Sequence, residues 1–563
     1  MRRLSSFVAA LAAVAPLAAQ SPAATASAAA RRDTIAVLLV TGTHPWLGAD
    51  GRIADVQGLV RDALGPGDAP RAAGWVRDGV AVPAVRATLA AIVADHESDA
   101  RERADARRLD SVAVASASTP LGETDAALLG LGMHVVVARQ ASRHAQGRID
   151  PTRVHAEWSL APEPIDLAAI VATLQRDGTQ PAAVFAQLEP TTPHYRRLVL
   201  ARDALRTLHA DSVAARLPVP AKGVKVGQKT NGLAPLARVL VTLGELAPGA
   251  RVDTVRYAAP LADAVLRAKR RADPKATSVL DASVAPLLVG QLAERESGLA
   301  LAIERWRWLP RAYAASPLVV NIPEFRLERW GEWAGDTASG GLAMKVVVGR
   351  ADSNATPVFA SSMTQVVFSP QWRVPVSIMR KEIGPAAQRS AGYLRKHDYY
   401  LVSARGEPLE ASAANIARIG NGVFVRQRSG GGNSLGRVKF NMFNPYDIYL
   451  HDTPSKRFFS RARRDLSHGC VRLADPTALA RFVLADNPAW TDERIGEAMQ
   501  GGKEKYVGLR KPVPVLLLYH TLVVEPDGAV KRFADVYGHD ARTLAAVRGE
   551  RTSAAPVTED AAP

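Results

Sequence analysis

The residue pattern of this chain changes near residue 300, and this change limits the folds open to it. Upstream, segments rich in Ala, Arg and Leu repeat their apolar residues at helical spacing, at 54–64, 83–94 and 165–175. Downstream, short β-branched or alternating runs are separated by Gly, Pro and Asn, at 318–322, 344–348, 365–368 and 437–440. The sequence therefore predicts a multidomain α+β protein with a helical N-terminal part and a mainly β C-terminal part.

Changes in composition divide the chain further. A Lys- and Gly-rich stretch at 219–229 predicts a linker. We therefore expect a helical scaffold domain over 29–225 and a small helical unit over 231–295. The mainly β domain is expected over 300–545 and a disordered tail over 553–563.

Helices and a hairpin are also expected within the β-rich part. One helical interruption is predicted at about 379–397, and another begins where Asp475 can cap a helix and Pro476 fits its first turn. The runs 513–524 and 529–536 flank Pro-Asp-Gly and predict a hairpin.

The first residues resemble an export signal. Met1-Arg2-Arg3 precedes an apolar stretch at 4–19 and then small residues, which predicts a signal peptide over 1–26. The arginines lack the usual flanking residues of the twin-arginine route, so we favour export in the unfolded state. No later run supplies the roughly 20 apolar residues of a membrane span, and we expect a periplasmic protein without one.

The formal net charge of +16 favours anionic partners. Nucleic acid is the weakest candidate among them because export removes the chain from the cytoplasm, and we expect no nucleic-acid partner. The arginines are spread along the chain, which is typical of a solvated surface.

The most reactive side chain is that of Cys470, the only cysteine in 563 residues. It lies in Ser-His-Gly-Cys-Val-Arg at 467–472, and His451 lies 19 residues upstream. A thiol attacks as its thiolate and needs a nearby base and local dipoles to lower its pKa. The pattern predicts a cysteine nucleophile with a histidine base.

Two other interpretations of Cys470 carry less weight. A lone cysteine is often only a small buried apolar residue, but the glycine and two histidines near it favour chemistry. A zinc site of His451, His468 and Cys470 lacks the usual paired spacing and a fourth ligand. We therefore expect neither a metal nor a cofactor.

With His451, the 467–472 motif resembles the signature of the L,D-transpeptidase catalytic domain, which remodels bacterial peptidoglycan. Further stretches resemble the large multidomain branch of this family, at 304–310, 320–323, 356–359, 372–375, 436–440 and 535–538. The resemblance implies a catalytic domain with a lid-like insertion over 379–420. It also implies a peptidoglycan-binding-like module at 231–295, which is degenerate because the usual Phe-Gln pair is absent.

The resemblance implies roles for the residues at the centre of the site. Cys470 would attack the amide bond before the terminal D-alanine of a tetrapeptide stem, release D-alanine and form a thioester. His451 would act as base and then acid, and the backbone carbonyl of Asp452 would orient it.

The neighbouring residues are expected to support the reaction or bind substrate. The amide of Gly469 would stabilise the oxyanion, and His468 would support the loop or the oxyanion. Arg472, Tyr449 and Ser467 are expected to contact substrate; Arg472 suits a carboxylate, and Tyr449 shares a strand face with the base.

The implied function is peptidoglycan cross-linking between the third residues of two stems, with stems as donor and acceptor and other cell-wall synthases as possible partners. Two alternatives stay open: a carboxypeptidase or endopeptidase that uses the same thioester, and a catalytically silent cell-wall-binding scaffold.

Two further groups of side chains each have two alternative roles. Trp306, Trp308 and Trp372 stand beside prolines in a β-rich region, which favours packing over sugar stacking. Five cations between base and nucleophile either attract stem carboxylates or are solvated: Lys456, Arg457, Arg461, Arg463 and Arg464.

Overall fold

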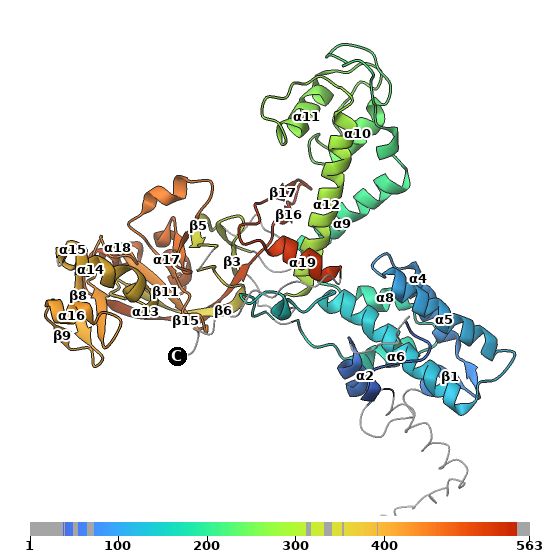
Figure 1. The fold of residues 1–563 in the computed structure, drawn as a ribbon, viewed down its shortest axis with the longest axis horizontal. Helices are drawn as coiled ribbons and strands as arrows, with labels where there is room; N and C mark the ends of the chain where they lie inside the picture. The colour runs from blue at the N-terminus through green and yellow to red at the C-terminus, as the bar shows by residue number, and fades with distance from the viewer. Residues whose placement is uncertain are drawn as a thin grey trace, which may run out of the picture. The chain divides into compact units, whose positions relative to one another are not determined.

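The computed structural model describes residues 38, 40–48, 55–64, 73–160, 162–310, 317–330, 341–351, 354–390 and 392–548 (Figure 1). The predicted signal peptide and C-terminal tail lie outside these residues. The chain divides into two compact units, residues 1–145 with 164–189 and residues 146–163 with 190–563. Among the described helices, none is both long and apolar enough to cross a bilayer.

The first unit is mainly helical, as the N-terminal pattern predicts. Its helices are α2 (Gln57–Leu64), α4 (Pro83–Ala94), α5 (Ala100–Ser116), α6 (Glu123–Gln146), α7 (Leu167–Leu174) and α8 (Pro181–Ala186), and its strands are β1 (Val76–Arg77) and β2 (Val80–Ala81). Helix α5 begins at a capping box in which Asp99 and Glu102 each accept a backbone N–H of the other. Helix α6 is buried on all sides for most of its length and forms the centre of this core.

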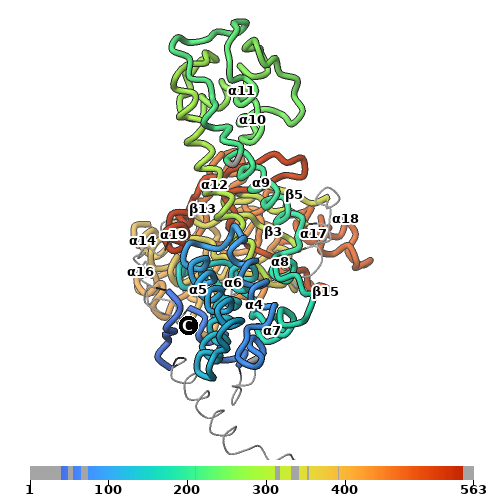
Figure 2. The backbone as a smooth tube through the Cα atoms, turned by 90° about the vertical axis from the view of Figure 1, so that its right-hand side faces the viewer, coloured from blue at the N-terminus to red at the C-terminus, as the bar shows by residue number. Residues whose placement is uncertain are grey.

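Four longer helices open the second unit. They are α9 (Pro193–Ala210), α10 (Leu233–Thr242), α11 (Ala259–Arg270) and α12 (Val284–Arg307). Helices α10 and α11 lie together at one end of α12 (Figures 1 and 2). The other end of α12 is buried, with Trp306 and Trp308 4% and 0% exposed. These two tryptophans pack as predicted.

A nine-stranded sheet forms the centre of the second unit, in the order β13-β5-β14-β12-β11-β6-β15-β3-β4. The strands are β3 (Leu318–Asn321), β4 (Arg326–Arg329), β5 (Ala343–Gly349), β6 (Phe359–Phe368), β11 (Val438–Met442), β12 (Leu450–His451), β13 (Asp465–Ser467), β14 (Val471–Leu473) and β15 (Lys505–Leu518). Strand β4 also pairs with β5, which joins the sheet into a closed ring of strands from β5 to β4. The mainly β C-terminal part is confirmed.

A second, smaller sheet lies within the insertion that follows β6. Its order is β7 (Trp372–Arg373), β10 (Val423–Gln427), β8 (Tyr399–Ser403) and β9 (Pro408–Leu409). It packs with α13 (Val376–Ile378), a π-helical turn η4 (Met379–Ile383), α14 (Gly384–Arg389), α15 (Gly392–Lys396) and α16 (Ala413–Ala417). These elements share an apolar core that is separate from that of the nine-stranded sheet.

The remaining elements follow the cysteine. Helix α17 (Pro476–Leu484) begins as predicted, with the Asp475 carboxylate accepting the N–H of Ala478 at 2.9 Å. It precedes α18 (Asp492–Gln500), and the chain ends in β16 (Leu522–Val524), β17 (Val530–Arg532) and α19 (His539–Val547). The predicted hairpin is shorter than expected because residues 513–518 belong to β15, which pairs with β6 and β3. Only β16 and β17 form it.

Candidate active site

Two adjacent parallel strands bring the predicted nucleophile and base to one face of the sheet. Leu450 of β12 pairs with Val471 of β14, and both are 0% exposed. Side chains alternate along a strand, so the side chains of Cys470 and His451, each next to a member of this buried pair, project from the opposite face. Tyr449 shares that face, with its ring centroid 5.6 Å from that of His451.

A cavity of about 840 Å³ opens on this face. Of the predicted site residues, all of which are described, Cys470, His468 and Tyr449 line it. The others do not line it: His451, Asp452, Ser467, Gly469 and Arg472. The cavity is large enough for a substrate of the size that ordinary ligand pockets hold.

The imidazole of His451 is oriented by its own strand. Its Nδ1 hydrogen-bonds the backbone carbonyl of Asp452, so this nitrogen carries the proton and Nε2 carries the lone pair. Burial, together with the charge of Arg472, lowers the pKa of His451 to about 3. The ring is therefore neutral at ordinary pH. The carboxylate of Asp452 faces elsewhere, toward Lys456 Nζ at 2.7 Å and the N–H of Arg437 at 2.9 Å.

The thiol of Cys470 is also neutral at rest. Burial raises its pKa, while contacts with Tyr449 and the charge of Lys439 oppose that shift. Lys439, which pairs with His451 across β11 and β12, holds its ammonium 3.7 Å from the centre of the Tyr449 ring. Lys439 and Tyr449 are thus placed to favour the thiolate when it forms.

The loop before the cysteine is held by hydrogen bonds within it. Ser467 Oγ donates to the carbonyl of Cys470 at 2.7 Å and accepts the N–H of Gly469 at 3.2 Å. Gly469 has φ of +117°, a conformation that glycine adopts readily, and its carbonyl accepts from Thr356 Oγ1 at 2.6 Å. Ser467 is 1% exposed and its side chain supports the loop, and its contact with substrate stays a prediction.

The same contact affects the predicted oxyanion donor. The N–H of Gly469 is directed at Ser467 Oγ and is not free in this structure. An oxyanion would need that bond to lengthen or would use another amide of the loop.

His468 connects the loop to the insertion. Its Nε2 lies 2.6 Å from the Glu382 carboxylate, within the π-helical turn η4. Such turns are rare and occur often at functional sites, since the extra residue redirects a side chain. Glu382 lies 86 residues before His468, and no local pattern identified this partner.

The sequence did not indicate that three further residues line the cavity. Lys439 stands within the run 436–440, yet only the register across β11 and β12 reveals its place near Cys470. Trp372 packs against the apolar core of the insertion, as expected, and it is also partly exposed and lines the cavity. Tyr506 is 53% exposed on the same cavity wall.

The cations between base and nucleophile do not line the cavity. Lys456 pairs with Asp452, and Arg463 pairs with Asp465 at 2.7 Å. Arg464 is buried and donates to the backbone carbonyls of Val346 and Phe325. These residues support the fold around the site.

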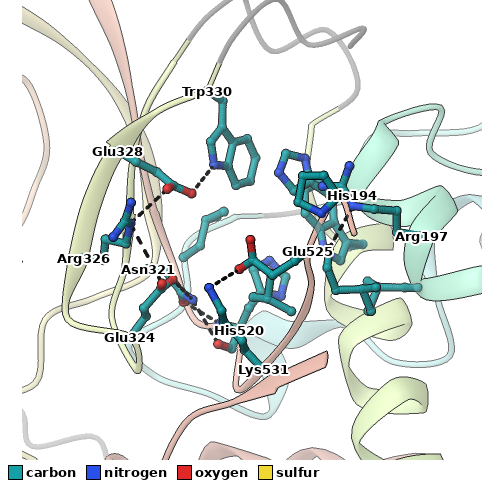
Figure 3. A pocket seen from close by; sticks show the side chains of 16 residues that line it. His194, Arg197, Asn321, Glu324, Arg326, Glu328, Trp330, His520, Glu525 and Lys531 are labelled. Carbon is teal, nitrogen blue, oxygen red and sulfur yellow. Dashed lines mark hydrogen bonds and ion pairs between the residues drawn. The ribbon is translucent and has the colours of Figure 1, made fainter. Parts of the chain in front are cut away.

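A second cavity, of about 120 Å³, is shown in Figure 3. Its carboxylates have partners: Glu328 accepts from Arg326 and from Trp330 Nε1, each at 3.0 Å, and Glu525 pairs with Lys531 at 2.8 Å. It holds no cysteine, and its two histidines stack on Trp306. Across the part of the chain that the structure describes, no cluster of three His, Cys, Asp or Glu is arranged for a metal ion.

Comparison with known proteins gives two family matches. Residues 317–513 match the family model described as the L,D-transpeptidase catalytic domain, and residues 72–201 match one described as a scaffold domain. A Haemophilus influenzae protein named "Putative L,D-transpeptidase" is 32% identical over 243 residues. The aligned region is 43% of this chain and 48% of that protein, so the chain spans about half the length of this curated relative.

A crystal structure of an L,D-transpeptidase (residues 123-326) from Xylanimonas cellulosilytica also matches. The match covers 54% of this chain and 100% of that chain, at 13% identity and a TM-score of 0.16. A likeness at this TM-score carries no argument about the fold.

The family match places the β-rich part of the chain in the class of transpeptidase domains. More specifically, residues 317–513 form an L,D-transpeptidase catalytic domain.

Proposed function

We propose that this protein is a periplasmic L,D-transpeptidase that joins the third residues of two peptidoglycan stems through a thioester on Cys470. The observation that carries the proposal is the position of Cys470, the only cysteine in the chain. It lines the cavity of about 840 Å³ and directly precedes β14, the strand that pairs with that of His451.

In the first half-reaction, the Cys470 sulfur attacks the carbonyl carbon before the terminal D-alanine. The thiol proton passes to Nε2 of His451, and the carbon–nitrogen bond breaks as that proton moves to the leaving D-alanine amine. A neutral thiol and a neutral imidazole suit this route, because the proton transfer and the attack occur together. The ammonium of Lys439 and the Tyr449 side chain stabilise negative charge on the sulfur.

The oxyanion requires a backbone donor near Cys470. In the proposed mechanism, either the Gly469 amide turns from Ser467 Oγ to the substrate or the Cys470 amide serves alone. One such donor is worth about 3 kcal/mol of transition-state stabilisation in known cases.

In the second half-reaction, a side-chain amine of the acceptor stem attacks the thioester carbonyl. The new amide forms, the carbon–sulfur bond breaks, and the acceptor's proton returns through His451 to the thiol. Attack by water instead yields a shortened stem. Trp372 and Tyr506 lie on the cavity wall and are candidates to position the acceptor and exclude water.

Other parts of the chain have proposed roles that follow from the family. Residues 379–420 would act as a lid, and the contact of Glu382 with His468 favours that role. Residues 231–295 would be a degenerate peptidoglycan-binding-like module and residues 1–26 a signal peptide. Cell-wall synthases are proposed partners, with the stems as donor and acceptor.

A hydrolase using the same thioester is the alternative, supported by the cavity volume of about 840 Å³, which leaves room for water. The test is to incubate the mature protein with purified disaccharide-tetrapeptides and identify the products by mass spectrometry, with Cys470→Ala in parallel. A dimer that has lost one D-alanine, absent with the variant, is the expected result. Tripeptide without dimer would indicate the hydrolase, and no product from a folded, reduced wild type would favour a silent scaffold.

A further inference from the structure

A third cavity lies away from the cysteine, between helices α11 and α12 and strand β17. Its volume is about 420 Å³. Arg271, which follows α11, lines it together with Arg295 of α12 and Arg532 of β17. Gly290 of α12 also lines the cavity. There is open space where a side chain at this position would project, so α12 does not fill the cavity here.

Arg295 is the unusual residue of this cavity. It is 8% exposed, and its Nε is buried without a hydrogen-bond partner. Among the described residues it forms no ion pair within 4.0 Å, whereas Arg271 pairs with Glu245 and Arg532 pairs with Glu294 at 2.8 Å. A buried donor without a hydrogen-bond partner costs about 1–3 kcal/mol, and folded proteins generally avoid this cost by supplying an acceptor.

The surroundings of Arg295 add to this cost. Burial and the nearby charges of Arg271 and Arg532 lower its pKa to about 10, and Glu245 opposes them only in part. An anion in the cavity would relieve both the desolvation and the repulsion.

The donors of the lining select the kind of anion. Three arginines line the cavity; Glu245 pairs with Arg271 and Glu294 with Arg532, so Arg295 is the cation left without a carboxylate. A phosphate group carries about −1.5 to −2 at neutral pH, with three strong acceptor oxygens. A carboxylate has only two acceptor oxygens and a single charge. Guanidinium forks bind phosphate oxygens in pairs, which suits a cavity lined by three arginines.

We propose that the cavity formed by Arg271, Arg295 and Arg532 is a binding site for a phosphate group, separate from the Cys470 site and independent of the reaction there. The phosphate is either a free or soluble phosphate or the headgroup of an anionic phospholipid. Binding would hold α11, α12 and β17 together around the buried charge of Arg295.

The test is calorimetry and thermal unfolding of the mature full-length protein with inorganic phosphate, at constant ionic strength balanced with chloride. Wild type should show saturable binding and a melting temperature that rises with phosphate. Arg295→Met should weaken binding by at least about tenfold, the loss expected for a charge-assisted hydrogen bond. The matched control is Arg251→Met, which removes an exposed arginine of the same helical region outside the cavity.

Arg532→Gln provides a second test on an exposed strand, should Arg295→Met not fold. It should also weaken phosphate binding, and acetate should bind wild type at least about tenfold more weakly than phosphate.

Sedimentation with phosphatidic acid vesicles, compared with phosphatidylcholine vesicles, distinguishes a lipid headgroup from a soluble phosphate. If wild type cosediments with phosphatidic acid vesicles and Arg295→Met does not, the ligand is a lipid headgroup. If wild type binds inorganic phosphate but does not cosediment with these vesicles, the ligand is a soluble phosphate. The proposal is overturned by no phosphate binding to wild type, by unchanged binding in both variants, or by equal binding of acetate.

Discussion

His468 and Glu382 join the loop of the cysteine to the insertion, with Nε2 and Oε1 2.6 Å apart. The Glu382 carboxylate is 48% exposed, so this pair contributes little to overall stability. Its position suggests that it fixes the loop relative to the insertion.

We therefore expect Glu382→Ala to slow D-alanine release from tetrapeptide while changing the free energy of unfolding by less than about 1 kcal/mol. The measurements are initial rates and urea unfolding. Glu410→Ala, an exposed glutamate of the same insertion, is the control and should leave both unchanged. Equal rates for the two variants would show that the contact has no part in the reaction.

The reactivity of Cys470 should depend on Lys439. The lysine charge lowers the pKa of the thiol against the effect of burial, so Lys439→Met should move the pH profile of iodoacetamide alkylation to higher pH. Tyr449→Phe should act in the same direction, since its side chain also favours the thiolate. Mass spectrometry of the single cysteine gives the rate at each pH. A profile that moves to lower pH in either variant would contradict the assigned cause.

The proposed pair of Cys470 and His451 could be named from the sequence, and the residues around it could not. Cys470 directly precedes β14, which pairs with the strand of His451, so the motif and its spacing already bring the two residues near each other. Lys439 and Trp372 reach the cavity through other strands, and Glu382 through a helical turn. Their positions depend on a sheet order in which neighbours in space are far apart in sequence. Residue patterns report which face a side chain occupies but not which distant strand lies beside it.

In the helical part of the chain, too, local sequence signals predict the elements but not which of them lie side by side. Helical periodicity located α4 and α7, because this signal is local. The buried charge of Arg295 has no such signal: its residue type in a helix is typical of a solvated surface, and only the packing of α11 and β17 reveals its burial.

Gly147 should not tolerate a side chain. Its φ is +85°, and a Cβ there would lie 2.5 Å from Oε1 of Glu304, which accepts the N–H groups of Arg148 and Ile149. Gly147→Ala should therefore destabilise the protein by about 2–5 kcal/mol, from backbone strain together with overpacking. Chemical unfolding gives the value. Gly249→Ala measures the backbone strain alone, because Gly249 has φ of +77° with open space around it. This substitution should lower the free energy of unfolding clearly less than Gly147→Ala. Equal costs would mean that the contact with Glu304 is unimportant.

Buried histidines should make the protein sensitive to acid. Burial lowers the pKa of His155, His194, His451 and His520 to about 3 and that of His539 to about 2. The ordinary value is 6.5, so below that pH the unfolded chain binds protons that the folded chain does not. Their contribution to stability is complete above pH 6.5 and is lost as the pH falls toward 3. Each histidine adds up to about 1.4 kcal/mol per pH unit to this loss.

His520 offers a direct test of this effect. It is 4% exposed, stacks on Trp306 with ring centroids 5.1 Å apart, and has no partner at either ring nitrogen. His520→Phe keeps the stacked ring and removes no hydrogen bond, so the free energy of unfolding at pH 7 should stay equal or rise. Between pH 6.5 and 3 its loss with falling pH should become shallower by up to about 1.4 kcal/mol per unit. His209→Phe, at an exposed position on α9, is the control for the pH series. A slope that His520→Phe leaves unchanged would mean that His520 is already protonated in the folded protein, and its burial would not be the source of the acid sensitivity.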